Sequence, residues 1–181
     1  MKRLFVAVNL ADEVKEELEE VKQSVINLFD MGVGEQVAKW VKKENMHITM
    51  QFIGEIKDEQ LPEIIKQVEE KVASWRKFKV RIGRVSYGAM DRGVPRLIWA
   101  EIDGNKDLEC VANILDNKNF KPHITLGRVR QWVWRKIDPE EQPNIEQDLD
   151  IKFEVSNIDI MESKLSRTGP VYSIFKKIDL L

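Results

Sequence analysis

Two short stretches decide the fold of this chain, His47-Ile48-Thr49-Met50 and His123-Ile124-Thr125-Leu126, because they repeat one pattern typical of a β-strand. The chain holds two histidines and three threonines, and each histidine has a threonine at the second position after it. Side chains two residues apart share one face of a strand. Each stretch therefore predicts a strand that presents an imidazole and a hydroxyl on one face and packs its apolar residues on the other.

Hydrophobic patterning around the motifs predicts further strands and helices. Leu4, Val6 and Val8 alternate with less apolar residues, which is typical of a half-buried strand. Gly54 is expected to end the first motif strand, and Asp58 to cap the helix after it. We expect strands at residues 3–10, 40–53, 78–87, 97–102, 151–161 and 171–178, a second motif strand opened by Pro122, helices at 12–29, 58–75 and 107–115, and a break at 31–34.

The order of these elements repeats. The second motif histidine lies 76 residues after the first, and each motif strand follows a strand and a helix. This order predicts an α+β fold, a single domain over residues 1–181 built from two pseudo-symmetric lobes. Each lobe is expected to hold an antiparallel sheet with outer helices and to contribute one motif strand to a central cleft.

Composition excludes several classes of protein. Hydrophobic residues make up 43% of the chain and charged residues 33%, which does not fit a disordered or membrane protein. A net charge of −2 excludes a generally basic nucleic-acid binder, although a local basic groove stays open. The one cysteine, Cys110, excludes an intrachain disulfide and fits a reducing compartment. We therefore expect a cytoplasmic protein without a membrane segment.

The paired motifs suit acid–base chemistry at a phosphodiester. One neutral histidine takes a proton from water, one protonated histidine gives a proton to the leaving oxygen, and hydroxyl donors hold the phosphoryl oxygens. No metal is expected, because each motif offers one histidine and the chain lacks HxH or HExxH spacing. No cofactor is expected either, since dinucleotide-binding and P-loop glycine patterns are absent. A metal site from both histidines and a carboxylate, or two histidines with structural roles only, are the alternatives.

Further binding residues come from charge and aromatic character. Residues 117–137 contain no acid but six basic residues, which predicts an anion-attracting patch beside His123. Arg128 and Arg130 are the candidates for phosphate contact. Strict alternation places both on the face opposite His123, so either needs a bulge or a strand end, with Gly127 as one place for it. Phe5 and Tyr172 are candidates for stacking a nucleobase, with core packing as the alternative.

Together these residues resemble the two-histidine phosphoesterase superfamily, whose signature is a pair of HxTx motifs. The closer resemblance is to the RNA 2′,3′-cyclic phosphodiesterase family, also called the LigT-like or 2′-5′ RNA ligase family. It covers nearly the whole chain and includes the segments 3–8, 40–41, 47–54, 122–128 and 169–172. The stretch 105–120 looks shorter than the family's usual helix and loop, which bears on the cleft rim and on substrate preference.

The resemblance implies a metal-independent enzyme that hydrolyses a terminal 2′,3′-cyclic phosphate on RNA to a 2′-phosphate. It implies that His47 protonates the departing 3′ oxygen, that His123 activates water, and that Thr49 and Thr125 bind the phosphate. Arg128 matches an arginine that commonly follows the second motif. The resemblance also implies reversible 2′-5′ ligation of tRNA halves, and we expect the protein to be a monomer.

Two other functions stay open from the sequence. The chain could be a nucleotide- or RNA-binding module that keeps the cleft without turnover. It could also be a phosphodiesterase that acts on small cyclic nucleotides or on 2′-5′ oligonucleotides.

Overall fold

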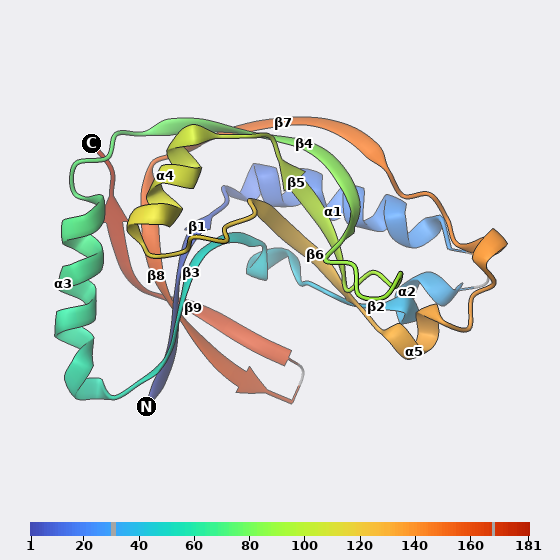
Figure 1. The fold of residues 1–181 in the computed structure, drawn as a ribbon, viewed down its shortest axis with the longest axis horizontal. Coiled ribbons are helices and arrows are strands. Elements are labelled where there is room, and N and C mark those ends of the chain that lie inside the picture. Colours follow the sequence, from blue (N-terminus) through green and yellow to red (C-terminus); the bar gives the residue numbers. More distant parts are fainter. Residues whose placement is uncertain (30–31, 168) are drawn as a thin grey trace.

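The computed structural model describes residues 1–29, 32–167 and 169–181, which form one antiparallel sheet of nine strands (Figure 1). The strand order is β7-β4-β5-β6-β3-β1-β8-β9, and the short β2 pairs with β6 beside this path. The strands are β1 (Lys2–Asn9), β2 (Ala38–Trp40), β3 (His47–Ile56), β4 (Phe78–Gly88), β5 (Leu97–Ile102), β6 (His123–Val129), β7 (Gln147–Val155), β8 (Asn157–Ser166) and β9 (Gly169–Asp179). The helices are α1 (Asp12–Asn27), α2 (Val33–Val37), α3 (Leu61–Val72), α4 (Lys106–Ile114) and α5 (Gln131–Trp134).

The sheet consists of two four-stranded halves that meet at the two motif strands. The pairing of β3 with β6 has one residue pair in its register, Ile48 opposite Ile124, and these are the second residues of the two motifs. Each half repeats one order of elements, β1-α1-β3 in the first and β5-α4-β6 in the second. The predicted α+β fold of two pseudo-symmetric lobes is therefore confirmed. The two halves meet at a joint, which is the pairing of β3 with β6, and this joint places the motifs side by side.

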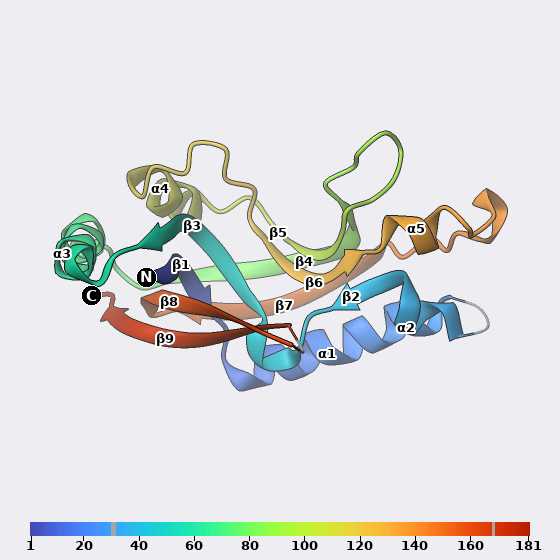
Figure 2. The ribbon, with the colours of Figure 1, turned by 90° about the horizontal axis from the view of Figure 1, so that it is seen from below.

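The helices pack around the sheet and share one core with it. In Figure 2, α1 lies along the lower edge of the view and α4 along the upper edge, and buried residues of both belong to that core. Helix α1 follows β1 of the first half but contacts β7 of the second, and α4 follows β5 but contacts β3. Leu4, Val6 and Val8 of β1 are buried in the core that includes Leu18 of α1. The opposite face of β1 carries Phe5, in a small separate cluster. In the described residues, no helix is long and apolar enough to span a membrane.

The strand predicted at residues 40–53 is two strands with an interruption. Strand β2 ends at Trp40, a 3-10 turn forms at Lys43–Asn45, and β3 begins at His47. Gly54 does not end β3 as expected, because its φ of +92° accommodates an irregularity and the strand continues to Ile56. Both β2 and β3 pair with the same edge of β6. The chain between them leaves this edge for a few residues and then returns to it.

The strand predicted at residues 151–161 is also two strands, and they belong to different halves of the sheet. Val155, at the end of β7, is opposite Phe78 of β4, whereas Asn157, at the start of β8, is opposite Asp179 of β9. Ser156 lies between them, and its carbonyl accepts a hydrogen bond from the Leu180 amide. The apolar residues that enter the main core change from Ile151 and Val155 before Ser156 to Ile158 and Ile160 after it, and this change of phase in the hydrophobic pattern marks the break.

The helix boundaries differ from the predicted ones in their caps. Asp58 does not cap a helix: it begins a 3-10 turn, and α3 starts at Leu61. Helix α4 is capped by the Asn105 side chain, which accepts a hydrogen bond of 3.0 Å from the Leu108 amide. The short helices α2 and α5 were not predicted. Of the predicted break at residues 31–34, Met31 lies outside the described residues.

Candidate active site

The two motif histidines are held on neighbouring strands in the same way. Nδ1 of His47 lies 2.7 Å from the carbonyl oxygen of Asn45, and Nδ1 of His123 lies 2.7 Å from the carbonyl oxygen of Lys121. A carbonyl oxygen only accepts hydrogen bonds, so Nδ1 carries the proton in both rings. In each neutral imidazole, Nε2 is therefore the atom that can accept a proton from a bound molecule.

The motif threonines share a face with the histidines, as the period of a strand predicts. Oγ1 of Thr49 lies 3.0 Å from Nε2 of His47. Thr125 lines the same cleft as His123. A threonine hydroxyl rotates freely enough to donate to a phosphoryl oxygen. The joint between the halves thus gathers two imidazoles and two hydroxyl donors.

A β-bulge in β6 turns Arg128 toward the histidines. The register with β5 shifts by one residue between Thr125 and Gly127, so Leu126 is an extra residue in β6. Leu126 and Gly127 are both buried, and Arg128 then lines the cleft. The structure therefore contains the bulge that contact between Arg128 and the site requires, at the place that the sequence suggests.

The first motif strand has the same bulge. The register of β3 with β1 shifts directly after Thr49, so Met50 is an extra residue there. The fifth residue after the motif histidine, which is Arg128 in β6, is Phe52 in β3. Phe52 lines the cleft with 77% of its surface exposed. Sequence reasoning missed Phe52, although its place in the repeated motif was the available signal.

One cleft at the joint, of about 910 Å³, brings together every site residue that the sequence suggests. Its size lies within the range of about 300–1,000 Å³ that is usual for small-molecule sites. Its lining includes Phe5, His47, Thr49, His123, Thr125, Arg128, Arg130 and Tyr172.

Aromatic rings surround His47 on the side of the first half. The ring centroids of Phe5 and Tyr172 lie 5.0 Å and 5.3 Å from that of His47, and the Tyr172 ring meets the imidazole edge-on. Phe5 is only 4% exposed, so it packs beneath the histidine, as the alternative for this residue predicts. On this side of the cleft, the half-buried Tyr172 and the exposed Phe52 are available to a ligand. The half-buried Trp40 lines the cleft beside β6.

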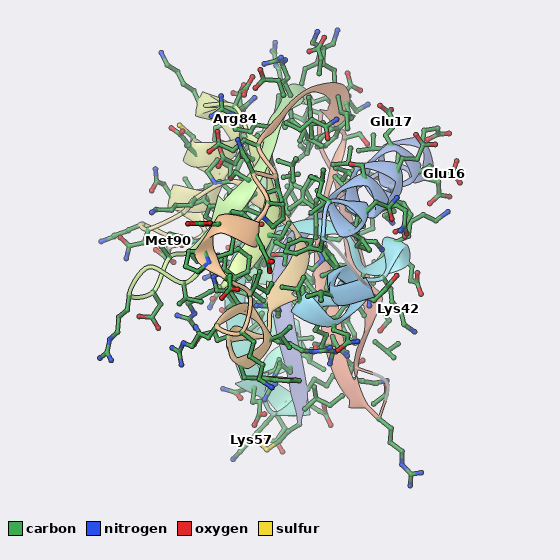
Figure 3. All side chains as sticks on the ribbon, turned by 90° about the vertical axis from the view of Figure 1, so that its right-hand side faces the viewer. Glu16, Glu17, Lys42, Lys57, Arg84 and Met90 are labelled. Carbon is green, nitrogen blue, oxygen red and sulfur yellow. The ribbon has the colours of Figure 1, made fainter. Side chains whose placement is uncertain are left out.

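The lining of the cleft is basic beside β2 and β6. Lys39, Lys42, Arg128 and Arg130 contribute to it, against one acid, Glu35. Figure 3 labels Lys42 among these side chains. Of the six basic residues in the acid-free stretch of the sequence, Arg128 and Arg130 line the cleft. Sequence reasoning missed both lysines, because β2 is brought to β6 by tertiary pairing that no local pattern reveals.

Burial and positive charge favour the neutral form of both histidines. Burial lowers the pKa of His47 from its ordinary 6.5 to about 4, the hydrogen bond to Asn45 opposes this shift, and the charge of Arg128 adds to it. Burial and the charge of Arg128 also lower the pKa of His123. An anion bound between the rings favours the imidazolium form and offsets the charge of Arg128.

The described residues offer no evident metal centre. In the ranges 1–29, 32–167 and 169–181, no three side chains of His, Cys, Asp or Glu gather as metal ligands would. The alternative of a metal held by both histidines and a carboxylate therefore lacks its carboxylate in the described part of the chain. Independence from metal stays a prediction.

Known proteins similar to this chain share one family. The family model described as LigT like Phosphoesterase matches residues 8–99. A protein of Archaeoglobus fulgidus named RNA 2′,3′-cyclic phosphodiesterase is 30% identical, over 94% of this chain and 96% of its own length. A protein of Thermotoga maritima with the same name is 28% identical, over 95% of this chain and 92% of its own length.

Solved structures share the fold across the whole chain. A crystal structure of a Thermus thermophilus protein has a TM-score of 0.79 and 25% identity, and covers 98% of this chain and 97% of its own. The fold also matches that of E. coli LigT in complex with 3′-AMP, with a TM-score of 0.74, 20% identity, and coverage of 99% and 97%. The resemblance drawn from the motifs and the expectation of an enzyme are both confirmed: this chain belongs to the LigT-like phosphoesterase family.

Proposed function

We propose that this protein hydrolyses the 2′,3′-cyclic phosphate at the end of an RNA to a 2′-phosphate, with His47 and His123 as a metal-independent acid–base pair. One observation carries this proposal: Nδ1 of each imidazole donates a hydrogen bond to the carbonyl oxygen two residues earlier. This arrangement leaves Nε2 of both rings available for proton transfer in one cleft. The names of the relatives support the cyclic phosphodiester as the substrate class.

In this mechanism, Nε2 of His123 takes a proton from water, and the water oxygen forms a bond to phosphorus. The bond from phosphorus to the 3′ oxygen breaks, and His47 gives its Nε2 proton to that oxygen. Thr49, Thr125 and Arg128 stabilise the charge that develops on the phosphoryl oxygens. The product keeps its phosphate on the 2′ oxygen, and the two histidines have exchanged their protonation states.

The rings that surround His47 support its proposed role as the acid. The leaving 3′ oxygen belongs to the terminal nucleoside, and the rings of Tyr172 and Phe52 that could stack on its base lie on the His47 side of the cleft. A donor must be protonated when the substrate is bound, whereas burial lowers the pKa of His47 to about 4. Binding of the anionic cyclic phosphate is therefore expected to raise that pKa.

The finer features of the proposal extend the same mechanism. Replacing water with an RNA 5′-hydroxyl turns hydrolysis into 2′-5′ ligation. We propose tRNA halves as substrates of this ligation, with the cyclic phosphate on one half and the 5′-hydroxyl on the other. The basic side chains of Lys39, Lys42 and Arg130 give the cleft affinity for an RNA backbone beyond the reacting phosphate. We propose that the protein acts in this way as a monomer in the cytoplasm.

The test uses an RNA oligomer that ends in a 2′,3′-cyclic phosphate, incubated in excess EDTA, with the position of the product phosphate identified. A 2′-phosphate product that disappears in His47→Ala and His123→Ala supports the proposal. Cys110→Ser, which changes an exposed residue outside the cleft lining, controls for contaminating ribonuclease through the same purification. Binding of the oligomer without any product would favour the binding-module alternative, and faster turnover of cyclic mononucleotides would favour a small-molecule substrate.

A further inference from the structure

A second pocket adjoins the cleft on the side of the second half. It measures about 360 Å³ and is lined by Ala89, Arg96, Leu97, Arg128, Val129 and Gln131. Arg128 lines both the pocket and the cleft, so the two spaces are neighbours. The loop between β4 and β5 forms one rim, and in Figure 3 this loop, marked by Met90, lies on the opposite side of the view from Lys42.

The chemistry of this pocket suits a phosphate. Its lining contains two guanidinium groups and an amide side chain but no acid. None of the ion pairs formed within the described residues involves Arg96 or Arg128. Guanidinium groups bind phosphates through paired hydrogen bonds, and two neighbouring cations without a carboxylate partner repel each other until an anion binds.

The position of the pocket indicates which strand of RNA brings that phosphate. In a displacement at phosphorus, the attacking and leaving oxygens lie roughly in line, on opposite sides of the phosphorus. With His47 protonating the leaving oxygen, the terminal nucleoside lies on the side of the first half. The attacking oxygen then enters beside His123, on the half that holds Arg96.

We infer that the pocket of Arg96, Arg128 and Gln131 is a second phosphate subsite, for an RNA strand whose 5′-hydroxyl takes the place of the attacking water. This inference rests on the proposed function. The phosphate in the pocket is the one on the 3′ oxygen of the attacking nucleoside, so one ribose separates it from the reacting oxygen. The subsite serves ligation and its reversal. Hydrolysis uses only Arg128, which lines both spaces, and does not need Arg96 or Gln131.

Ligation needs no reactant besides the RNA with the cyclic phosphate and the incoming strand. The 5′ oxygen of the incoming strand forms a bond to phosphorus as its proton passes to Nε2 of His123. The bond from phosphorus to the 3′ oxygen breaks, and His47 protonates that oxygen. The product is a 2′-5′ phosphodiester beside a free 3′-hydroxyl, and the cyclic ring supplies the activated phosphorus.

The experiment compares two small acceptors in the presence of an RNA oligomer that ends in a 2′,3′-cyclic phosphate. Adenosine and adenosine 3′-phosphate both offer a 5′-hydroxyl, but only the second carries the phosphate that the subsite would hold. We expect wild-type protein to form the 2′-5′ product about tenfold or more faster with adenosine 3′-phosphate, the size expected of a charge-assisted contact. We expect higher salt to reduce this preference.

Arg96→Gln is expected to abolish the preference between the acceptors while hydrolysis of the same oligomer changes less than twofold. Arg135→Gln, at an exposed arginine of the same half outside both linings, is the matched control and should keep the preference. Equal rates for both acceptors with wild-type protein, an unchanged preference in Arg96→Gln, or hydrolysis without any ligation product would each overturn the inference. If the wild-type protein does not hydrolyse the oligomer at all, the proposed function itself is contradicted.

Discussion

Phe52 and Arg128 hold the same position in the two halves of the sheet, because each is the fifth residue after its motif histidine and each follows a bulge. One is an exposed aromatic ring and the other is a cation, and both line the cleft. The backbone of the site is therefore nearly symmetric, whereas its chemistry is not. We expect this difference to give a bound nucleotide one preferred orientation, with its base toward Phe52 and its phosphate toward Arg128.

Substitution at these two positions is expected to affect different kinetic constants. Phe52→Ala removes a stacking surface worth about 1–3 kcal/mol per base, so we expect KM to rise with little change in kcat. Arg128→Gln removes charge at the reacting phosphate, so we expect kcat to fall by at least tenfold. Steady-state kinetics on a cyclic mononucleotide separate the two effects, and a purely kcat defect in Phe52→Ala would contradict the assigned orientation.

Each histidine is expected to be needed for turnover. His47→Ala and His123→Ala remove proton transfers that usually contribute about 10²–10⁴-fold to a rate. Single-turnover hydrolysis of the oligomer measures the loss, with thermal unfolding to show that the variants are folded. A loss below about tenfold in either variant would exclude that histidine as acid or base.

The two imidazoles should titrate below neutral pH in the free protein. Because the chain has only two histidines, their ring signals in a proton NMR titration are readily assigned with one variant. We expect His47 to titrate at about 4, and His123 below its ordinary value. Arg128→Gln should raise both pKa values, since it removes a positive charge that lowers them. An ordinary pKa for His47 would show that its burial is overcome by solvent in the open cleft.

The depressed pKa of His47 also predicts a loss of stability in weak acid. The unfolded chain takes up a proton at this residue near pH 6.5, whereas the folded chain does so at about 4. Its contribution is therefore fully present above pH 6.5 and falls as the pH drops toward 4, by ~1–3 kcal/mol. Urea unfolding at pH 7 and pH 4.5 measures this decrease, which should be smaller in His47→Gln than in the wild-type protein.

Gly127 is expected to tolerate no side chain without disturbing the bulge. A Cβ atom there would lie 2.8 Å from the Trp40 ring and 3.1 Å from Cβ of Ala38. We expect Gly127→Ala to lower the free energy of unfolding by ~1–3 kcal/mol through overpacking. The same change should displace Arg128 and reduce kcat. Gly104→Ala, where a Cβ would meet nothing within 4 Å, is the control for a change from glycine alone.

The sequence predicts those parts of the site that depend on the period of a strand. The faces of His47, Thr49, His123 and Thr125 follow from alternation, and the structure keeps all four as expected. The bulge near Gly127 was inferred only because Arg128 otherwise pointed away. Its counterpart at Met50 was not predicted, since nothing in the local pattern of β3 required a shift of register.

The remaining differences come from tertiary pairing. The alternation at residues 151–160 looks like one strand unless the change of phase at Ser156 is noticed, because hydrophobic pattern does not report which partner a strand takes. Lys39 enters the cleft because it lies opposite Arg128 in the pairing of β2 with β6. Such neighbours depend on how distant segments meet, so spacing along the chain gives no sign of them.

The matching hydrogen bonds from Nδ1 of the two imidazoles to backbone carbonyls have a consequence for repeated turnover. If each hydrolysis moves one proton onto His123 and one away from His47, every cycle ends with His123 protonated and His47 neutral, the reverse of the starting state. A new substrate that always binds in one orientation cannot react with the histidines in these reversed protonation states. The protein must therefore reset through exchange with solvent once the product departs, and an open cleft with two weakly basic rings makes this return fast.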